Sequence, residues 1–254
     1  MSSSEIGTFN DGVARLIEKV ECRRLVTESE KAEAYRLRYD AYLREGAILP
    51  NPTKTIVDRF DETPNNHTFG FYIDGRIAGS VRLGYGTTES CDVPAMATFP
   101  DVLGPIMAEP GRSLIDPTRF VLDAECARLY PKLAYVTLRL AWLVSDHLLV
   151  DYTLASVRTE HQAFYRRFYG HTLLCDARPY NSLIKPLSLM LLPCRSSRTR
   201  GLTRYPFLAS ARSEFLKLWP GPFGPLAPSP ATSDAAAGAP ADDQILAHAP
   251  MSLG

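Results

Sequence analysis

Residues 113–122 read Ser-Leu-Ile-Asp-Pro-Thr-Arg-Phe-Val-Leu, a largely apolar run with an Asp and an Arg three positions apart. Branched and aromatic residues in such a run predict a β-strand. Asp116 and Arg119 form a DxxR motif within it. Charge next to large apolar residues on a strand predicts partial burial, and a buried charge has to be paired. The motif is therefore a candidate functional feature.

Four more charged residues lie upstream of this strand. Arg38 opens the run Arg-Tyr-Asp-Ala-Tyr that ends at Tyr42, and Asp58 and Asp61 form a DxxD motif. Arg82 lies in Gly-Ser-Val-Arg-Leu, which also predicts a strand. For six arbitrary charged residues, solvated ion pairs at a sheet edge are the default interpretation. Here the apolar neighbours of several members favour burial and mutual pairing instead.

The rest of the chain predicts an α/β protein. Apolar residues recur at helical spacing over 11–21 and 29–45, and two strands at 67–73 and 76–85 flank an Asp-Gly turn. Residues 87–112 are rich in turn formers and are expected to form a long loop, with room for one helical turn. After strand 113–122 the pattern predicts, in order, helix 130–151, strand 151–158, helix 160–169, and strands 171–175 and 188–192.

The order and context of the charged motifs resemble the acyl-homoserine-lactone synthases, which belong to the acyl-CoA N-acyltransferase (GNAT) superfamily. The DxxR motif stands where that family usually has ExxR. Residues 153–158 and 164–170 are similar to the strand-helix-glycine signature of the superfamily. The resemblance covers about residues 30–192. It implies a GNAT-like fold with a central mixed sheet flanked by helices.

Two departures refine this resemblance. Residues 43–53 lack the tryptophan that lactone synthases carry in the region that receives S-adenosylmethionine. The sequence looks closer to the N-acyl amino acid synthases, which acylate an amino acid from acyl carrier protein. The superfamily's Gly-rich pyrophosphate loop is also missing after residue 122. Because a phosphate loop needs glycines and exposed N–H groups, this absence argues against free coenzyme A as the preferred donor.

The expected roles follow from the chemistry of acyl transfer. Asp116 is the candidate base that deprotonates the amine, directly or through water, because an ammonium has no lone pair. Arg119 is expected to orient Asp116 or to bind a substrate carboxylate. The oxyanion needs N–H donors, which the superfamily supplies from a bulged strand, expected here near 115–122. The expected substrate-binding residues form a pocket wall: Arg38, Tyr42, Asp58, Asp61 and Arg82.

Composition limits the partners. With 28 basic and 28 acidic residues the formal net charge is +0, so nucleic-acid binding has no support. The five scattered cysteines and the absence of a visible signal peptide predict a cytoplasmic protein without a metal site. No bound cofactor is expected, and acyl-phosphopantetheine on acyl carrier protein is the expected donor substrate. Contact with lipid is expected only through the product. The candidate docking residues are basic: Arg128, Lys132, Arg139, Arg166, Arg167 and the Arg-rich segment 195–217.

The expected organisation is an N-acyltransferase domain at 1–193, a basic aromatic extension at 194–219 and a disordered Pro/Ala-rich tail at 220–254. The function expected is transfer of a long-chain acyl group from acyl carrier protein to the amine of an amino acid. Two alternatives remain. One is an acyl-homoserine-lactone synthase that uses S-adenosylmethionine, and the other is an inactive acyl-binding regulatory module.

Overall fold

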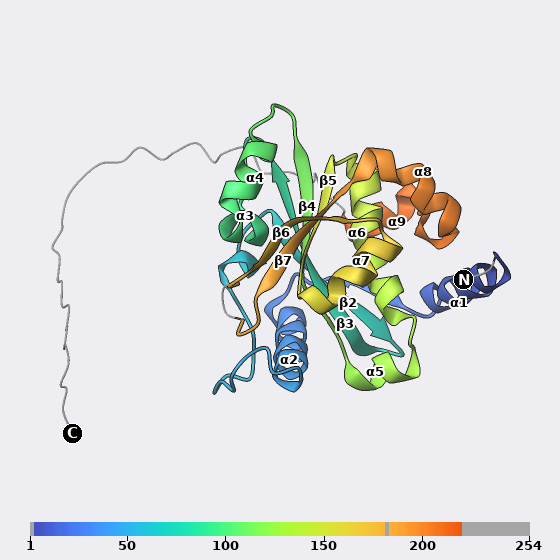
Figure 1. Ribbon diagram of the computed structural model, residues 1–254. Coiled ribbons are helices and arrows are strands. Elements are labelled where there is room, and N and C mark those ends of the chain that lie inside the picture. Colours follow the sequence, from blue (N-terminus) through green and yellow to red (C-terminus); the bar gives the residue numbers. More distant parts are fainter. Residues whose placement is uncertain (1–2, 181–182, 220–254) are drawn as a thin grey trace, which may run out of the picture.

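The computed structural model describes residues 3–180 and 183–219, and the described part is built on a seven-stranded mixed sheet (Figure 1). The strand order is β1-β2-β3-β4-β5-β7-β6. Neighbouring strands are antiparallel except β4 and β5, which are parallel. The strands are β1 (Glu21–Arg24), β2 (Asn66–Ile73), β3 (Arg76–Thr87), β4 (Ser113–Leu122), β5 (Tyr152–Val157), β6 (Thr172–Arg178) and β7 (Leu187–Pro193). The predicted α/β class is confirmed.

Helices cover both faces of the sheet (Figure 1). α2 begins at a capping box in which Thr27 and Glu30 satisfy each other's backbone N–H groups. The helices are α1 (Ser3–Ile17), α2 (Glu28–Arg44), α3 (Pro94–Thr98), α4 (Pro100–Met107), α5 (Ala124–Leu129), α6 (Leu133–Leu148), α7 (Gln162–Phe168), α8 (Cys194–Arg204) and α9 (Arg212–Leu218). Short 3₁₀ turns occur at η1 (Arg59–Asp61), η2 (Thr159–His161) and η3 (Pro206–Leu208). Within the described residues, no helix has the length and apolar character needed to cross a membrane.

Alternation along the strands separates an apolar face from a polar one. Val81 and Leu83 of β3 pack into the core formed with α6 and α9. Arg82 lies between them in sequence and therefore points to the opposite face of the sheet. There its guanidinium group contacts Asp58 and Asp61 near α2. The polar site is thus built on the α2 face of the sheet.

β4 bulges in its middle and then parts from β5. Ser80 pairs with Val121 and Arg82 with Thr118, so Arg119 and Phe120 both lie opposite Val81. Arg119 adopts a left-handed backbone conformation with φ 54°. β4 pairs with β5 only at Leu114–Tyr152 and Ile115–Thr153. The structure therefore has a bulged strand where one was expected, beside a gap in the ladder.

The region expected as a long loop with one helical turn contains two helices, so that expectation was wrong. β3 extends to Thr87, and α3 and α4 follow it. Both helices begin with proline, at Pro94 and Pro100, a residue suited to the first helical turn. Their short lengths hide the helical period from the sequence. Phe99, between the two helices, and Leu103 of α4 pack with side chains of β4 and β7.

The segment 194–219 packs into the core, although the family resemblance does not extend to it. Trp219 is 1% exposed and its ring lies 4.9 Å from that of Phe69. Arg139 of α6 is buried and donates to the carbonyls of Phe207 and Ala209 and to the carboxylate of Glu214. Arg139 was expected to contact a docking partner, but it instead links α6 to this segment inside the protein. The predicted disordered tail, 220–254, lies outside the described residues.

Candidate active site

Asp58 is the centre of an ion-pair network. Arg82 donates to its two carboxylate oxygens at 2.6 and 3.1 Å, and Arg119 donates to Oδ2 at 2.6 and 3.1 Å. The backbone N–H of Phe60 donates to Oδ1 at 2.9 Å. Burial by itself raises the pKa of Asp58, but the hydrogen bonds and charges of Arg82 and Arg119 outweigh it and hold this pKa well below its usual range. Asp58 is therefore ionised.

Asp61 extends the network to α2. Arg38 is fully buried and donates to Asp61 at 2.8 Å and to the Thr68 hydroxyl at 3.0 Å. Arg82 Nη1 lies 3.1 Å from Asp61 Oδ1, and the Asp58 backbone N–H donates to Asp61 Oδ2 at 3.0 Å. One continuous set of charged contacts thus joins α2, η1, β3 and β4. Five of the six charged residues singled out in the sequence meet here, as the pairing hypothesis requires.

Asp116, the sixth residue, has a different environment. It is fully buried, and its Oδ2 accepts the Ala95 N–H at 2.8 Å at the start of α3. Its Oδ1 has no hydrogen-bond partner among the described residues. Burial raises its pKa to about 6, against the opposing effects of the Ala95 N–H and the Arg82 charge. A carboxylate with this pKa changes protonation state close to neutral pH.

Tyr42 and Tyr180 complete the surroundings of Arg119. The Arg119 guanidinium lies 5.7 Å from the Tyr42 ring centroid. Burial raises the pKa of Tyr180, the charge of Asp116 adds to the effect, and Arg119 opposes it. Tyr180 is thus electrostatically close to both members of the DxxR motif. The sequence reasoning missed Tyr180, because no motif surrounds it and it lies far along the chain from β4.

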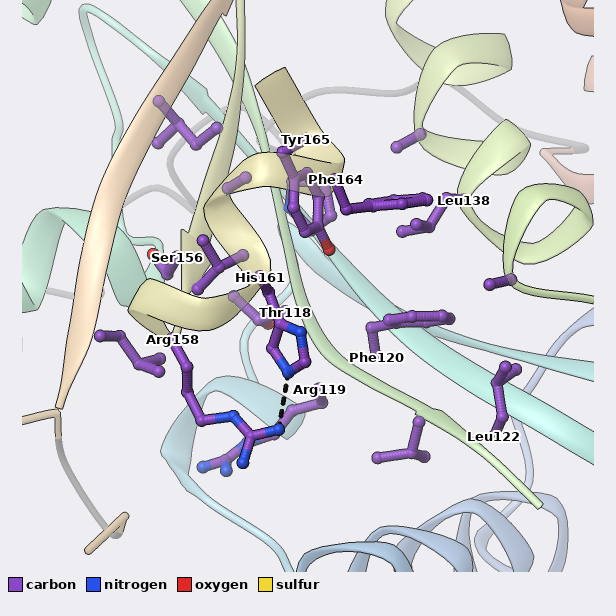
Figure 2. A pocket seen from close by; sticks show the side chains of 18 of the residues that line it. Thr118, Arg119, Phe120, Leu122, Leu138, Ser156, Arg158, His161, Phe164 and Tyr165 are labelled. Atoms are coloured by element: carbon purple, nitrogen blue, oxygen red, sulfur yellow. Dashed lines mark hydrogen bonds between the residues drawn. The ribbon is translucent and has the colours of Figure 1, made fainter. Parts of the chain in front are cut away.

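A cavity of about 460 Å³ lies between β4 and β5 where their pairing stops. Residues Pro117 to Leu122 of β4 and Thr153 to Val157 of β5 line it, together with side chains of α6 and α7. Figure 2 shows Phe120, Leu138, Phe164 and Tyr165 around this space. Most of the lining is apolar. Tyr42, Arg119 and Tyr180 also line the cavity, which connects it to the ion-pair network.

Charged residues gather at the solvent-exposed side of the cavity. They include the exposed residues Arg44, Glu45 and His161 and the half-buried Arg158 and Lys185. Arg158 donates to Glu45 at 2.8 Å and lies 2.6 Å from the His161 ring nitrogen (Figure 2). Lys185 donates to the Glu45 carbonyl at 3.1 Å. The cavity therefore combines a charged entrance with an apolar interior.

This arrangement suits a ligand with a polar head and a long apolar chain. A family model described as N-acyl amino acid synthase FeeM matches residues 33–193. The chain belongs to this family. It is therefore an acyltransferase, and all six charged residues, Tyr42 and Tyr180 lie within the matched range.

Solved structures support the same fold. The structure of FeeM, an N-acyl amino acid synthase from uncultured soil microbes, is 20% identical with a TM-score of 0.61, covering 73% of this chain and 96% of its own. The acyl-homoserine-lactone synthase BjaI, described as CoA-dependent, is 15% identical with a TM-score of 0.57, covering 74% of this chain and 89% of its own. The lactone synthase LasI is 14% identical with a TM-score of 0.53, covering 68% and 88%. No curated protein matches the sequence.

Proposed function

We propose that this acyltransferase moves a long-chain fatty acyl group from acyl carrier protein to the amine of an amino acid. The observation that carries the proposal is the apolar cavity of about 460 Å³ with a charged entrance, placed between diverging parallel strands. Its volume is in the range of small-molecule sites. An acyl chain fits the apolar interior, and the thioester and amine fit the end where Arg119, Tyr42 and Tyr180 lie.

Asp116 is the proposed base. An amino acid carries an ammonium group at neutral pH, and the ammonium has to lose a proton before its nitrogen attacks the thioester carbonyl. With a pKa of about 6, Asp116 is mostly ionised at neutral pH and accepts that proton directly or through water. Asp116 itself is not among the lining residues of the cavity, but its chain neighbour Pro117 and Tyr180, which senses its charge, both line it. When the tetrahedral intermediate collapses, the pantetheine thiol leaves and the amide bond remains.

The bulged strand supplies the proposed oxyanion stabilisation. Beyond Ile115, β4 has no registered pair with β5, so backbone N–H groups on this edge face the cavity region instead of a ladder. Preorganised N–H donors stabilise a developing oxyanion strongly in a water-poor site. Arg119 lines the cavity with a side chain that is 4% exposed, and its two bonds to Asp58 fix its positive charge beside the reacting groups.

The helix that follows β4 supports a carrier-protein donor over coenzyme A. Asp123 is the N-cap residue of α5, and its carboxylate accepts the Cys126 N–H at 3.0 Å. The first turn also holds Glu125. A helix start that is already capped by a carboxylate does not attract a pyrophosphate group. Arg128, Arg166 and Arg167 remain exposed and are the proposed contacts for an acidic carrier protein.

The function is tested with purified enzyme, long-chain acyl carrier protein and a panel of amino acids, with products identified by mass spectrometry. We expect N-acyl amino acids, and faster turnover from the carrier protein than from the matching acyl-CoA. Acyl lactones released with methylthioadenosine in the presence of S-adenosylmethionine would identify a lactone synthase. Tight acyl binding without turnover of any amine would identify a binding module.

The donor surface is tested separately with Arg166→Ala/Arg167→Ala. We expect a higher KM for acyl carrier protein that converges with wild type as salt rises, because exposed charges act on encounter and are screened. The KM for a small acyl-pantetheine is expected to stay unchanged. Arg23→Ala is the matched control, since Arg23 is exposed on β1 at the far end of the strand order. Equal losses with both donors would contradict docking at α7.

A further inference from the structure

A second cavity of about 310 Å³ adjoins the acyl cavity. The end of α6 and the start of α8 form most of it, and Leu149 and Val150 contribute apolar lining. Three residues line both cavities: Trp142, Thr153 and Leu192. Because the two spaces share these residues, the same side chains form the wall between them.

Trp142 is the large side chain of this wall. Its ring stacks on Tyr169 with centroids 6.4 Å apart and an interplanar angle of 20°. On the other side its ring edge meets α8 so closely that a Cβ added at Gly201 would lie 2.2 Å from it. The indole Nε1 has no hydrogen-bond partner among the described residues. Packing alone therefore holds the indole in place.

The other two wall residues are fixed differently. The Thr153 hydroxyl is shared with Ser145 at 2.7 Å and with Cys194 at 3.2 Å, and Thr153 pairs with Leu192 in the β5–β7 ladder. These contacts belong to the framework of the sheet. Replacing Trp142 removes the bulk of the wall and leaves that framework in place.

We propose that Trp142 closes the inner end of the acyl site and sets the longest acyl chain that the enzyme holds. The second cavity is then an extension of the site that a chain reaches only when Trp142 is smaller. This inference rests on the proposed acyl transfer. Its test is a binding measurement, so it is decided independently of turnover.

The test measures dissociation constants of acyl-pantetheines of increasing chain length. For wild type, affinity is expected to rise about fourfold per methylene, the effect of burying one CH₂ group, until the chain end meets Trp142. Beyond that chain length, which is the break in the series, affinity should no longer rise with each added methylene. In Trp142→Ala the gain should continue for several further methylenes. Trp142→Phe keeps a ring against Tyr169, and it should shift the break in the same direction by less.

Leu138→Ala is the matched control. Leu138 lies one turn earlier on α6 and lines the first cavity, but it is not among the lining residues of the second. Its truncation enlarges the acyl site without opening the wall, so the break should stay at the wild-type length. A break that does not move in Trp142→Ala or Trp142→Phe, or that moves equally in Leu138→Ala, overturns the proposal.

Leu149→Asp tests the route itself. Leu149 is exposed, lines the second cavity, and has φ 55°, a conformation that Asp adopts more often than Leu does. In the wild-type background this change should leave the affinity series unaltered. In the Trp142→Ala background it should abolish the gain for the longest chains, because their ends would meet a carboxylate. An undiminished gain there would show that the chain does not enter the second cavity.

Discussion

Asp58 and Asp116 are aspartates of one site whose pKa values move in opposite directions. Asp58 accepts hydrogen bonds from two arginines, and its pKa falls well below the usual range. Asp116 is fully buried with one backbone N–H on one oxygen, and its pKa rises to about 6. Burial acts in the same direction on both carboxyl groups. Direct pairing with arginine therefore decides which of the two carboxyl groups has a lowered pKa and which has a raised one.

This contrast predicts that substitutions in the two regions will have different effects. The paired carboxylates hold α2, η1 and β4 together, so their loss should appear mainly in stability. Asp116 carries a buried charge without an arginine in hydrogen-bond contact, which is the environment of a tuned acid–base group. Its loss should appear mainly in turnover. The following variants are chosen to separate these outcomes.

Asp116→Asn should have the largest effect. The Asn side-chain oxygen still accepts the Ala95 N–H, but the basic group is lost, so kcat should fall by roughly 10²–10⁴-fold. The melting temperature at neutral pH should not fall, because the variant removes a desolvated charge. Steady-state kinetics and thermal melting check both statements. Asp101→Asn, the same change at an exposed pair with Arg178, is the control. Wild-type turnover by Asp116→Asn would remove this residue from the mechanism.

Arg82→Ala should mainly destabilise the fold. Arg82 is buried and pairs with both Asp58 and Asp61, so its removal leaves two carboxylates short of a donor. Breaking a buried pair typically costs about 3–5 kcal/mol of unfolding free energy. Denaturant unfolding measures this loss. Arg76→Ala is the control, since Arg76 is exposed on the same strand and pairs with Asp123 and Glu125. Similar losses in both variants would contradict the distinction between buried and surface pairs.

Thr118→Val should have a smaller effect on stability. The Thr118 hydroxyl accepts the Arg82 Nε–H at 3.1 Å, and a valine of similar shape removes only that acceptor. A hydrogen bond to a charged group is worth about 1.5–3 kcal/mol. Thr172→Val provides the comparison, because its hydroxyl donates to an uncharged group, the Leu191 carbonyl. A loss as large as that of Arg82→Ala would mean that Thr118 also supports the bulge.

The pH dependence should show the smallest step, about tenfold in kcat/KM per pH unit below the Asp116 pKa. Activity should fall as pH drops through about 6, because the base becomes protonated. The free energy of unfolding should change with pH in the opposite direction to the activity. A raised carboxyl pKa contributes stability that is full below the ordinary value of 3.8 and is lost as pH rises through about 6. Relative to Asp116→Asn, wild type should therefore lose stability over this range. A rate profile without an acid limb would argue against Asp116 as the base.

The charged network could be predicted from the sequence because its members sit in recognisable local motifs. DxxD places two carboxylates on one tight turn, and the alternation of β3 turns Arg82 away from the apolar core. The separate position of Asp116 could not be predicted from such motifs. The β3–β4 register sets Asp116 opposite Gly84 and Thr118 opposite Arg82. Asp116 thus lies two residues along the ladder from the position opposite Arg82, and its carboxylate meets the start of α3 instead of the arginines.

The packing of residues 194–219 could not be predicted from the sequence either. Their basic and aromatic composition predicts an extension with a binding surface, because charge is usually solvated. In the structure Arg139 pairs with Glu214 and donates to the Phe207 carbonyl, and the aromatic side chains pack beside α6. Composition does not specify which side of a short helix meets the core. Long-range packing decides it.

The sequence by itself determined the α/β fold, the superfamily and the residues of the ion-pair network, because periodicity and short motifs are local properties of the chain. Only the tertiary structure decided where β4 parts from β5, which side chains line the cavity between them, and that Trp142 lines both this cavity and a second one. Such features depend on register and on contacts between residues far apart in sequence. Local patterns carry no information about them, because the free energy of these contacts exists only once the elements have packed together.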